Sequence, residues 1–160
     1  MQNIIYKPIG IIHTPINNPV GAPIQPIGGK GIKGYVEIYT DYEACLKDLD
    51  GFSHIFLLYH FHLSKGYSAE VKPFMDDTLR GVFSTRAPKR PNPIGLSVVR
   101  LIKIEGRILQ IEDLDIVDGT PLLDIKPYVP KVDAHEVERL GWLTDNNADF
   151  SNKKADDWFQ

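Results

Sequence analysis

A proline-rich segment at residues 84–100, STRAPKRPNPIGLSVVR, restricts the fold of this chain more than any other feature. Its residues 86–93 contain three prolines, and each one removes a backbone donor, fixes φ and biases the preceding residue toward extended geometry. A helix is therefore excluded here, and Asn92, between two of the prolines, is held on a rigid backbone. A strand-like run follows directly at residues 94–104. We interpret the segment as a rigid loop that enters a strand, with a solvated surface loop as the alternative.

Short strand signals recur along the rest of the chain, whereas helix signals are few. Apolar runs that alternate, or that are bounded by turn residues, are typical of strands. The expected strands are residues 4–12, 33–40, 53–63, 82–85, 94–104, 107–115 and 121–128, with long loops at 15–31 and 64–80. Short helices are expected at residues 41–49, after a capping box of Thr40 and Glu43, and at 134–140. The pattern predicts a mainly β fold: a small, closed or partly closed antiparallel β-barrel with a few short helices.

The length of 160 residues suits one domain, and we assign residues 1–143 to the barrel and residues 144–160 to a polar C-terminal tail. The single cysteine, Cys45, excludes an internal disulfide, and no Cys/His spacing typical of zinc sites is present. The N-terminal sequence lacks the features of a signal peptide, and no apolar run is long enough for a membrane helix. We expect a cytoplasmic protein without a membrane partner.

The net charge of −3 conceals two segments of opposite charge. Residues 78–104 contain six basic side chains and no acidic one. Residues 105–124 contain six acidic side chains and one arginine. The overall charge therefore gives no argument for nucleic-acid binding, but the distribution indicates a strongly basic segment beside a strongly acidic one.

A two-residue turn at Glu105-Gly106 is expected to join these segments into a hairpin. In the expected register, Leu96 pairs with Asp115 and Val98 pairs with Asp113. The basic and acidic segments then meet at one end of the hairpin. That end suits a ligand that carries both charges, or a polar heterocycle and a sugar. Structural salt bridges between the two segments are the alternative.

The strand at residues 53–63 places His60 and His62 on one face, two residues apart, where both side chains are able to ligate a metal. No third ligand is identifiable, so contact of His62 with a bound ligand is the favoured interpretation. Further along, Asp118-Gly119 is a turn signal that also fits an Asx-turn. No G-x-G-x-x-G fingerprint is present, so a nucleotide-like cofactor is not held in the Rossmann manner.

Two long strings, STRAPKRPNPIGLSVVRL and DLDIVDGTPLLDIKPYVP, closely resemble the TrmO family, also called YaeB-like or TsaA-like. The strings IGIIHTP and LDGFSHIFLLYHFH and the loop Pro23-Ile24-Gln25 match the same family, so the resemblance covers residues 4–130. The resemblance implies a TsaA-like β-barrel, S-adenosylmethionine as cofactor, tRNA as partner and a homodimer. It also implies methylation of N6 of N6-threonylcarbamoyladenosine next to the anticodon.

The resemblance implies a set of residues that bind S-adenosylmethionine: Pro23, Ile24, Gln25, His62, Leu63, Arg86, Leu96, Glu112, Asp113, Leu114 and Asp115. Asp118 or Tyr128 is expected to remove the proton of the attacking nitrogen, with Asn92 orienting the target base. Phosphates of tRNA are expected to contact three cations: Arg80, Lys89 and Arg90. No metal is expected.

Two departures from the family pattern are visible. Ile24 stands where many members carry arginine. After Pro130 the sequence also lacks the C-terminal extension of longer members, for which we expect the dimer to compensate. Two alternatives to the methyltransferase stay open: a non-catalytic module that binds S-adenosylmethionine or RNA, and a metal-dependent hydrolase that uses His60 and His62.

Overall fold

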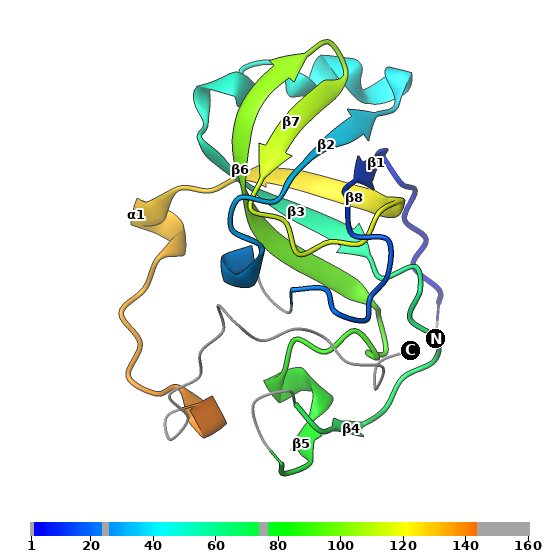
Figure 1. The fold of residues 1–160 in the computed structure, drawn as a ribbon, viewed down its shortest axis with the longest axis vertical. Helices are drawn as coiled ribbons and strands as arrows, with labels where there is room; N and C mark the ends of the chain where they lie inside the picture. The colour runs from blue at the N-terminus through cyan, green and yellow to red at the C-terminus, as the bar shows by residue number, and fades with distance from the viewer. Residues whose placement is uncertain (1, 24–25, 74–76, 144–160) are drawn as a thin grey trace.

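The computed structural model describes residues 2–23, 26–73 and 77–143. Among these residues, six antiparallel strands close into a barrel in the order β1-β2-β7-β6-β3-β8 (Figure 1). The strands are β1 Gly10–His13, β2 Lys33–Ile38, β3 His54–His60, β6 Ile94–Glu105, β7 Ile108–Glu112 and β8 Thr120–Pro127. Every strand of the barrel has a hydrogen-bonded neighbour on both sides, so no edge is left open. The predicted barrel is confirmed.

Alternate residues of the strands fill the barrel interior. On β2, Val36 and Ile38 point inward and are buried, as the alternation of the sequence predicted. On β3, the inward residues are Ile55, Leu57 and Tyr59, and the histidines of the strand lie on the other, half-buried face. Further fully buried side chains of this core are Ile12, Val99, Leu109, Ile111, Leu114, Ile116 and Leu122.

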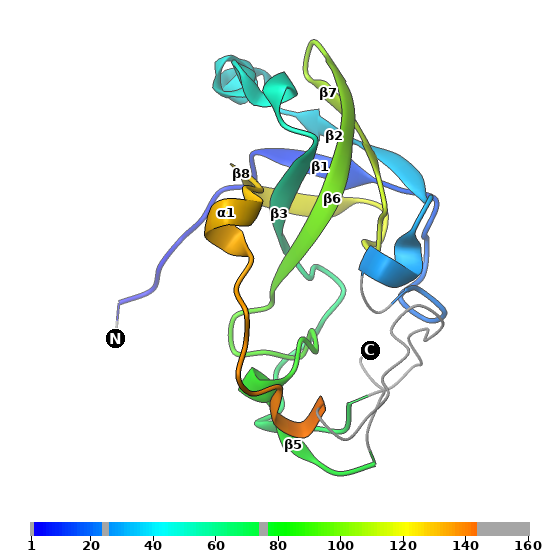
Figure 2. The ribbon, with the colours of Figure 1, turned by 90° about the vertical axis from the view of Figure 1, so that its left-hand side faces the viewer.

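A smaller lobe lies below the barrel in the views of Figures 1 and 2. It contains the two-stranded sheet of β4 Glu70–Val71 and β5 Arg80–Gly81, followed by the 3-10 helix η4 Val82–Ser84. Val71, Val82 and Ala87 form a buried apolar cluster that is separate from the barrel core. The strand expected at residues 82–85 is therefore wrong, because η4 forms there with Thr85 as its C-cap.

The helices are shorter than expected. Residues 40–51 form the 3-10 helices η2 Thr40–Leu46 and η3 Leu49–Gly51, and η2 begins without a side-chain cap, so the capping box does not form. The other helical turns are η1 Pro26–Gly29, α1 Pro130–Asp133 and η5 Gly141–Leu143. No helix forms at residues 134–140, all of which are exposed. The tail at 144–160 lies outside the described residues.

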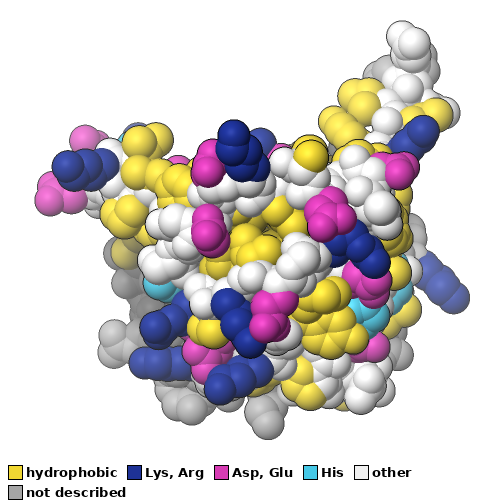
Figure 3. Space-filling view, turned by 90° about the horizontal axis from the view of Figure 1, so that it is seen from above, with side chains coloured by type: hydrophobic (Ala, Val, Ile, Leu, Met, Phe, Trp, Pro, Cys, Tyr) yellow, Lys and Arg dark blue, Asp and Glu magenta, His cyan; other side chains and the backbone are white. Residues whose placement is uncertain are grey.

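The first strand also begins later than expected, at Gly10, because Ile4, Ile5 and Tyr6 have no apolar surface to pack against and are 78%, 85% and 67% exposed. Figure 2 shows this N-terminal segment leading away from the barrel. The nearby end of the barrel carries η2 and η3 and a shallow hollow of about 220 Å³, lined by Ile9, Ile38, Tyr42, Cys45, Leu46, Leu49, Leu123, Asp124 and Ile125. Apolar side chains are visible between charged ones at this end (Figure 3).

The register of the β6–β7 hairpin differs from the expected one. Glu105 pairs with Ile108, so the two-residue turn is Gly106-Arg107 rather than Glu105-Gly106. Gly106 takes the first central position, where its φ of 59° suits glycine. An irregularity between Leu101 and Lys103 then shifts the register again.

The expected cross-strand pairs at the far end of this hairpin do not form. β7 ends at Glu112, opposite Arg100, so Asp113 and Asp115 lie beyond the ladder. Leu96 pairs with Leu58 of β3 on the outer face instead.

The packing of Gly95 against Tyr59 gives a test of the barrel interior. A Cβ at Gly95 would overlap the Tyr59 ring, which is 5% exposed and has no room to move. We expect Gly95→Ala to lower the free energy of unfolding by about 1–3 kcal/mol, measured by urea denaturation. The control Gly51→Ala, with nothing within 4 Å of the added atom, should change it by about 0.5 kcal/mol at most. Equal stability of the two variants would contradict this packing.

Candidate functional site

One end of the barrel, which we call the open end, carries most of the polar residues that were predicted to form the site. Because the strands are antiparallel, β1, β3 and β7 end there and β2, β6 and β8 begin there. The segment at residues 113–119 crosses this end between β7 and β8. The lobe of β4, β5 and η4 lies on the same side of the barrel (Figure 1).

Asp115 is held by a hydrogen-bonded chain that starts in the barrel core. The Ser97 hydroxyl donates to Asp115 Oδ1 at 2.7 Å, so the Tyr59 hydroxyl, 2.9 Å from Ser97 Oγ, is the donor in that second contact. Burial raises the pKa of Asp115 to about 6, while the Ser97 hydrogen bond and the positive charge of Arg86 act in the opposite direction. The expected pairing of Leu96 with Asp115 is therefore wrong: Ser97 contacts Asp115 instead, and the positive charge of Arg86 acts on this carboxylate.

Asp113 and Leu114 support the loop that precedes β2. The Gly31 N–H donates to Asp113 Oδ1 at 2.8 Å, and the Asp113 N–H donates to the Ile32 carbonyl at 3.0 Å. The Leu114 carbonyl lies against Gly29, where a Cβ would overlap it. Leu114 is 0% exposed and belongs to the barrel core, so the structure does not open it to a ligand as predicted.

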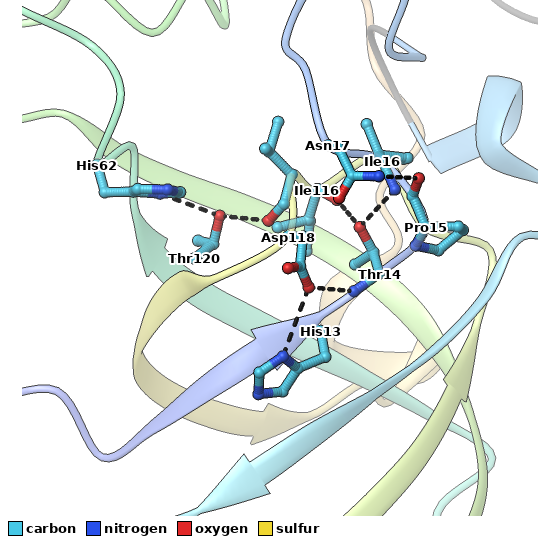
Figure 4. Close-up of polar contacts among 10 residues, drawn as sticks. His13, Thr14, Pro15, Ile16, Asn17, His62, Ile116, Asp118 and Thr120 are labelled. Carbon is cyan, nitrogen blue, oxygen red and sulfur yellow. Dashed lines mark hydrogen bonds and ion pairs between the residues drawn. The ribbon is translucent and has the colours of Figure 1, made fainter.

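Asp118 closes the turn after β1 (Figure 4). Its Oδ1 accepts the Thr14 N–H at 3.0 Å and lies 3.4 Å from His13 Nδ1. The Asp118 N–H donates to the Ile16 carbonyl at 2.7 Å. The His13 ring stacks on Tyr35, with centroids 4.6 Å apart. Asp118 therefore fixes the backbone of the segment that follows β1.

His62 lies on the other side of the same turn (Figure 4). Its Nδ1 is 3.3 Å from Thr120 Oγ1, and the Thr120 hydroxyl donates to the Val117 carbonyl at 2.7 Å. Burial and the neighbouring His60 lower the pKa of His62, and Asp118 opposes them. A neutral imidazole is therefore held at the open end of the barrel.

Other predicted site residues lie around this end or away from it. Asn92 is exposed, and its carbonyl accepts the Ile94 N–H at 2.8 Å where β6 begins. Leu63 and Leu96 are 46% and 51% exposed. Tyr128 lies at the opposite end of β8, where its N–H donates to the His54 carbonyl at 3.1 Å, so the structure does not bring it beside Asp118.

Of the remaining predicted cofactor residues, the structure describes Pro23 and Glu112. Pro23 is half-buried in the loop before β2, whereas Ile24 and Gln25 lie outside the described residues. Glu112 is the last residue of β7 and pairs with Lys33.

The basic residues of the proline-rich segment have separate surroundings. Arg90 Nη1 donates to three carbonyls, those of Val82 at 3.1 Å, Thr85 at 2.8 Å and Ala87 at 3.4 Å. Its guanidinium also lies 5.8 Å from the centre of the Phe83 ring. Arg90 therefore holds the turn after η4 together, which differs from the phosphate contact expected for it.

The two other expected phosphate ligands are also in this lobe. Arg80 lies over the Trp142 ring at 5.8 Å. The Lys89 carbonyl accepts the Ser68 N–H at 3.2 Å.

Sequence reasoning missed Ser97, Thr120 and His13. Ser97 and Thr120 are 2% and 3% exposed. A period-two reading of β6 places Ser97 on the inward face with Val99, and a polar residue there was the available signal. In the described ranges, no three His, Cys, Asp or Glu side chains are grouped so as to hold a metal ion. No helix of those ranges is long and apolar enough to cross a membrane.

Known proteins resemble the chain over this barrel and its open end. The family model of the tRNA-methyltransferase O N-terminal domain matches residues 11–134. A probable S-adenosyl-L-methionine-binding protein of Pyrococcus abyssi is 55% identical, over 89% of this chain and 78% of that protein. The tRNA (adenine(37)-N6)-methyltransferase of Escherichia coli is 36% identical, over 81% of this chain and 60% of the enzyme.

The mouse enzyme of the same name is 37% identical, over 82% of this chain and 32% of the enzyme. The crystal structure of TrmO from Pseudomonas aeruginosa has a TM-score of 0.74 and 36% identity, over 88% of this chain and 63% of that one. The chain thus spans between a third and two thirds of the methyltransferases that it matches.

The raised pKa of Asp115 predicts a pH dependence of stability. Its pKa of about 6 in the folded chain lies above the ordinary 3.8, so the folded chain binds this proton more tightly than the unfolded chain. The resulting stabilisation is present below about pH 4 and is lost as the pH rises through 6. Against Asp115→Asn, the wild-type chain should lose on the order of 2 kcal/mol across this range in urea denaturation. The control Asp124→Asn, whose carboxylate contacts Lys126 on the outer surface, should not change this slope.

Proposed function

This chain belongs to the tRNA-methyltransferase O family, and on that premise we propose that it transfers a methyl group from S-adenosylmethionine to N6 of an adenosine in tRNA. The observation that carries the proposal is the half-buried Asp115 carboxylate, which Ser97 holds at one end of the barrel that the family model covers and on which the positive charge of Arg86 acts. The target nucleoside is N6-threonylcarbamoyladenosine next to the anticodon. The enzyme acts as a cytoplasmic homodimer.

The residues at this end suit the chemistry of the cofactor. S-Adenosylmethionine carries a carboxylate, an ammonium group and a sulfonium, so it needs fixed charges of both signs. Arg86 would pair with the carboxylate, since guanidinium and carboxylate form two parallel hydrogen bonds. Asp115, ionised at neutral pH, would compensate a positive group. Gly31 lacks a side chain and has open space beside it, which allows a close backbone approach to the adenosine part.

The bound cofactor supplies an electrophilic methyl group. Transfer is an in-line displacement, so the chain contributes chiefly by holding the adenosine in line with that group. The exposed Asn92 amide, on its rigid proline-flanked backbone, orients the target base. Lys89 and Arg80, in the lobe beside the site, contact phosphates and give affinity without reading sequence. Arg90 supports that surface through its three carbonyl contacts.

A second candidate function is binding of S-adenosylmethionine without catalysis. It is favoured by the relative of which the chain covers 78%, because that protein is named only for binding the cofactor. A methyl-transfer assay separates the two. Purified chain is incubated with labelled S-adenosylmethionine and tRNA, with and without the threonylcarbamoyl group. Transfer to the modified tRNA supports the enzyme and its proposed substrate, transfer to unmodified tRNA alone overturns the substrate, and tight cofactor binding without transfer overturns the enzyme.

Two neighbouring cations should separate cofactor binding from tRNA binding. We expect Arg86→Ala to weaken binding of S-adenosylmethionine by about 10- to 100-fold in calorimetric titration, because a charge-assisted pair is lost. The same variant should leave tRNA affinity within about threefold. Lys89→Ala should instead lower tRNA affinity and reduce the slope of log affinity against log salt by about one.

Lys47→Ala is the matched control, because Lys47 is exposed beside η2 at the opposite end of the barrel. It should change neither titration. An Arg86→Ala variant with wild-type cofactor affinity would refute the division of roles.

A further inference from the structure

We propose that His62 is the general base of the reaction and that Thr120 holds it in the reactive tautomer. The inference rests on the methyltransferase function proposed above and assigns the proton transfer within it. The resemblance had associated His62 with cofactor binding, and Asp118 or Tyr128 with proton removal. The hydrogen bonds at the open end of the barrel favour a different assignment (Figure 4).

The tautomer follows from a count of protons at Thr120. A hydroxyl group has one proton to donate, and Thr120 donates it to the Val117 carbonyl at 2.7 Å. The contact of 3.3 Å between Thr120 Oγ1 and His62 Nδ1 therefore needs a proton on Nδ1. Thr120 is 3% exposed, so water does not replace this arrangement. In the neutral ring, Nε2 then carries the lone pair.

The surroundings keep the ring neutral. His62 is half-buried, and burial is the largest cause that lowers its pKa. The charged or titratable groups that act on it are His60, from β3, which lowers the pKa further, and Asp118, from the turn before β8, which opposes the other two. A neutral imidazole whose Nε2 has no hydrogen-bond partner in the described ranges is ready to accept a proton at neutral pH.

The alternative proton acceptors either make other contacts or lie elsewhere. Asp118 Oδ1 accepts the Thr14 N–H and contacts His13, so it holds the turn after β1. Asp115 accepts the Ser97 hydroxyl, and the positive charge of Arg86 acts on it. Tyr128 lies at the opposite end of the barrel. His62, by contrast, directly follows Phe61, whose N–H donates to the Pro93 carbonyl at 2.8 Å, next to the exposed Asn92 that we expect to orient the target base.

The step balances without another reactant. The N6–H proton passes to His62 Nε2 while the nitrogen electron pair forms the new N–C bond to the methyl carbon. The electrons of the C–S bond stay on sulfur, which changes from a sulfonium to a neutral thioether. The imidazolium then returns its proton to water.

The test replaces the basic nitrogen and keeps the hydrogen bond. In His62→Asn, the side-chain amide takes the place of Nδ1 and donates to Thr120, but no base is left. We expect the single-turnover rate on threonylcarbamoylated tRNA to fall about 100-fold or more, with the cofactor Kd within about threefold of the wild type. Added imidazole should restore part of the rate in His62→Ala. Because the pKa of His62 is lowered from the ordinary 6.5, the wild-type rate should fall with acid only below that pH, and His62→Asn should lack this limb.

Thr120 is tested as a positioning residue. Thr120→Val should lower kcat with KM unchanged, and Thr120→Ser, which keeps the hydroxyl, should restore kcat. The matched control is His54→Asn, at the opposite end of β3, which should keep the wild-type rate and pH profile. A wild-type rate in His62→Asn, or a loss explained entirely by cofactor affinity, overturns this inference alone. Absence of transfer by the unaltered chain overturns the proposed function together with the inference.

Discussion

Pairing of β8 with both β1 and β3 closes the barrel, and the arrangement of the open end depends on it. β8 begins at Thr120, opposite Ile12 of β1. Its arrival there forces the segment after β7 to cross the end of the barrel within a few residues. That segment contains Asp113, Asp115 and Asp118, and each of them accepts a hydrogen bond from a different element. These elements are the loop before β2, the strand β6 and the turn after β1, respectively. In an open sheet the three carboxylates would not reach all three of these elements.

The open end of the barrel is continuous with the apolar core. Ser97 and Tyr59 point inward among Val99, Leu57 and other buried side chains, yet they end in a hydrogen bond to Asp115. A buried hydroxyl needs a partner, because an unpaired one costs about 1–3 kcal/mol. The Asp115 carboxylate accepts the last hydrogen bond of the Tyr59–Ser97 pair, and this bond fixes the position of the carboxylate. The cost is a raised pKa, which the positive charge of Arg86 limits.

The proline-rich segment divides its cations between structure and function. Arg90 turns back to three carbonyls of the backbone before Pro88, those of Val82, Thr85 and Ala87. This contact gives the segment between η4 and β6 its shape. Arg86, only four residues earlier, instead acts through its positive charge on Asp115. Equal charge in the sequence therefore corresponds to different roles, and the local backbone decides between them.

Period-two alternation and turn residues are local properties, so they were enough to predict the barrel class, the inward faces of β2 and β3, and a basic segment beside an acidic one. The family strings added the cofactor and the position of Arg86 and Asp115. The contact of Asp115 with Ser97 rather than Leu96 could not be predicted, because the turn at Gly106 and the irregularity near Leu101 set the register of the hairpin. The tertiary structure also separated Tyr128 from Asp118 and gave His62 its partner Thr120, 58 residues away. Such contacts depend on barrel closure, which no local pattern encodes.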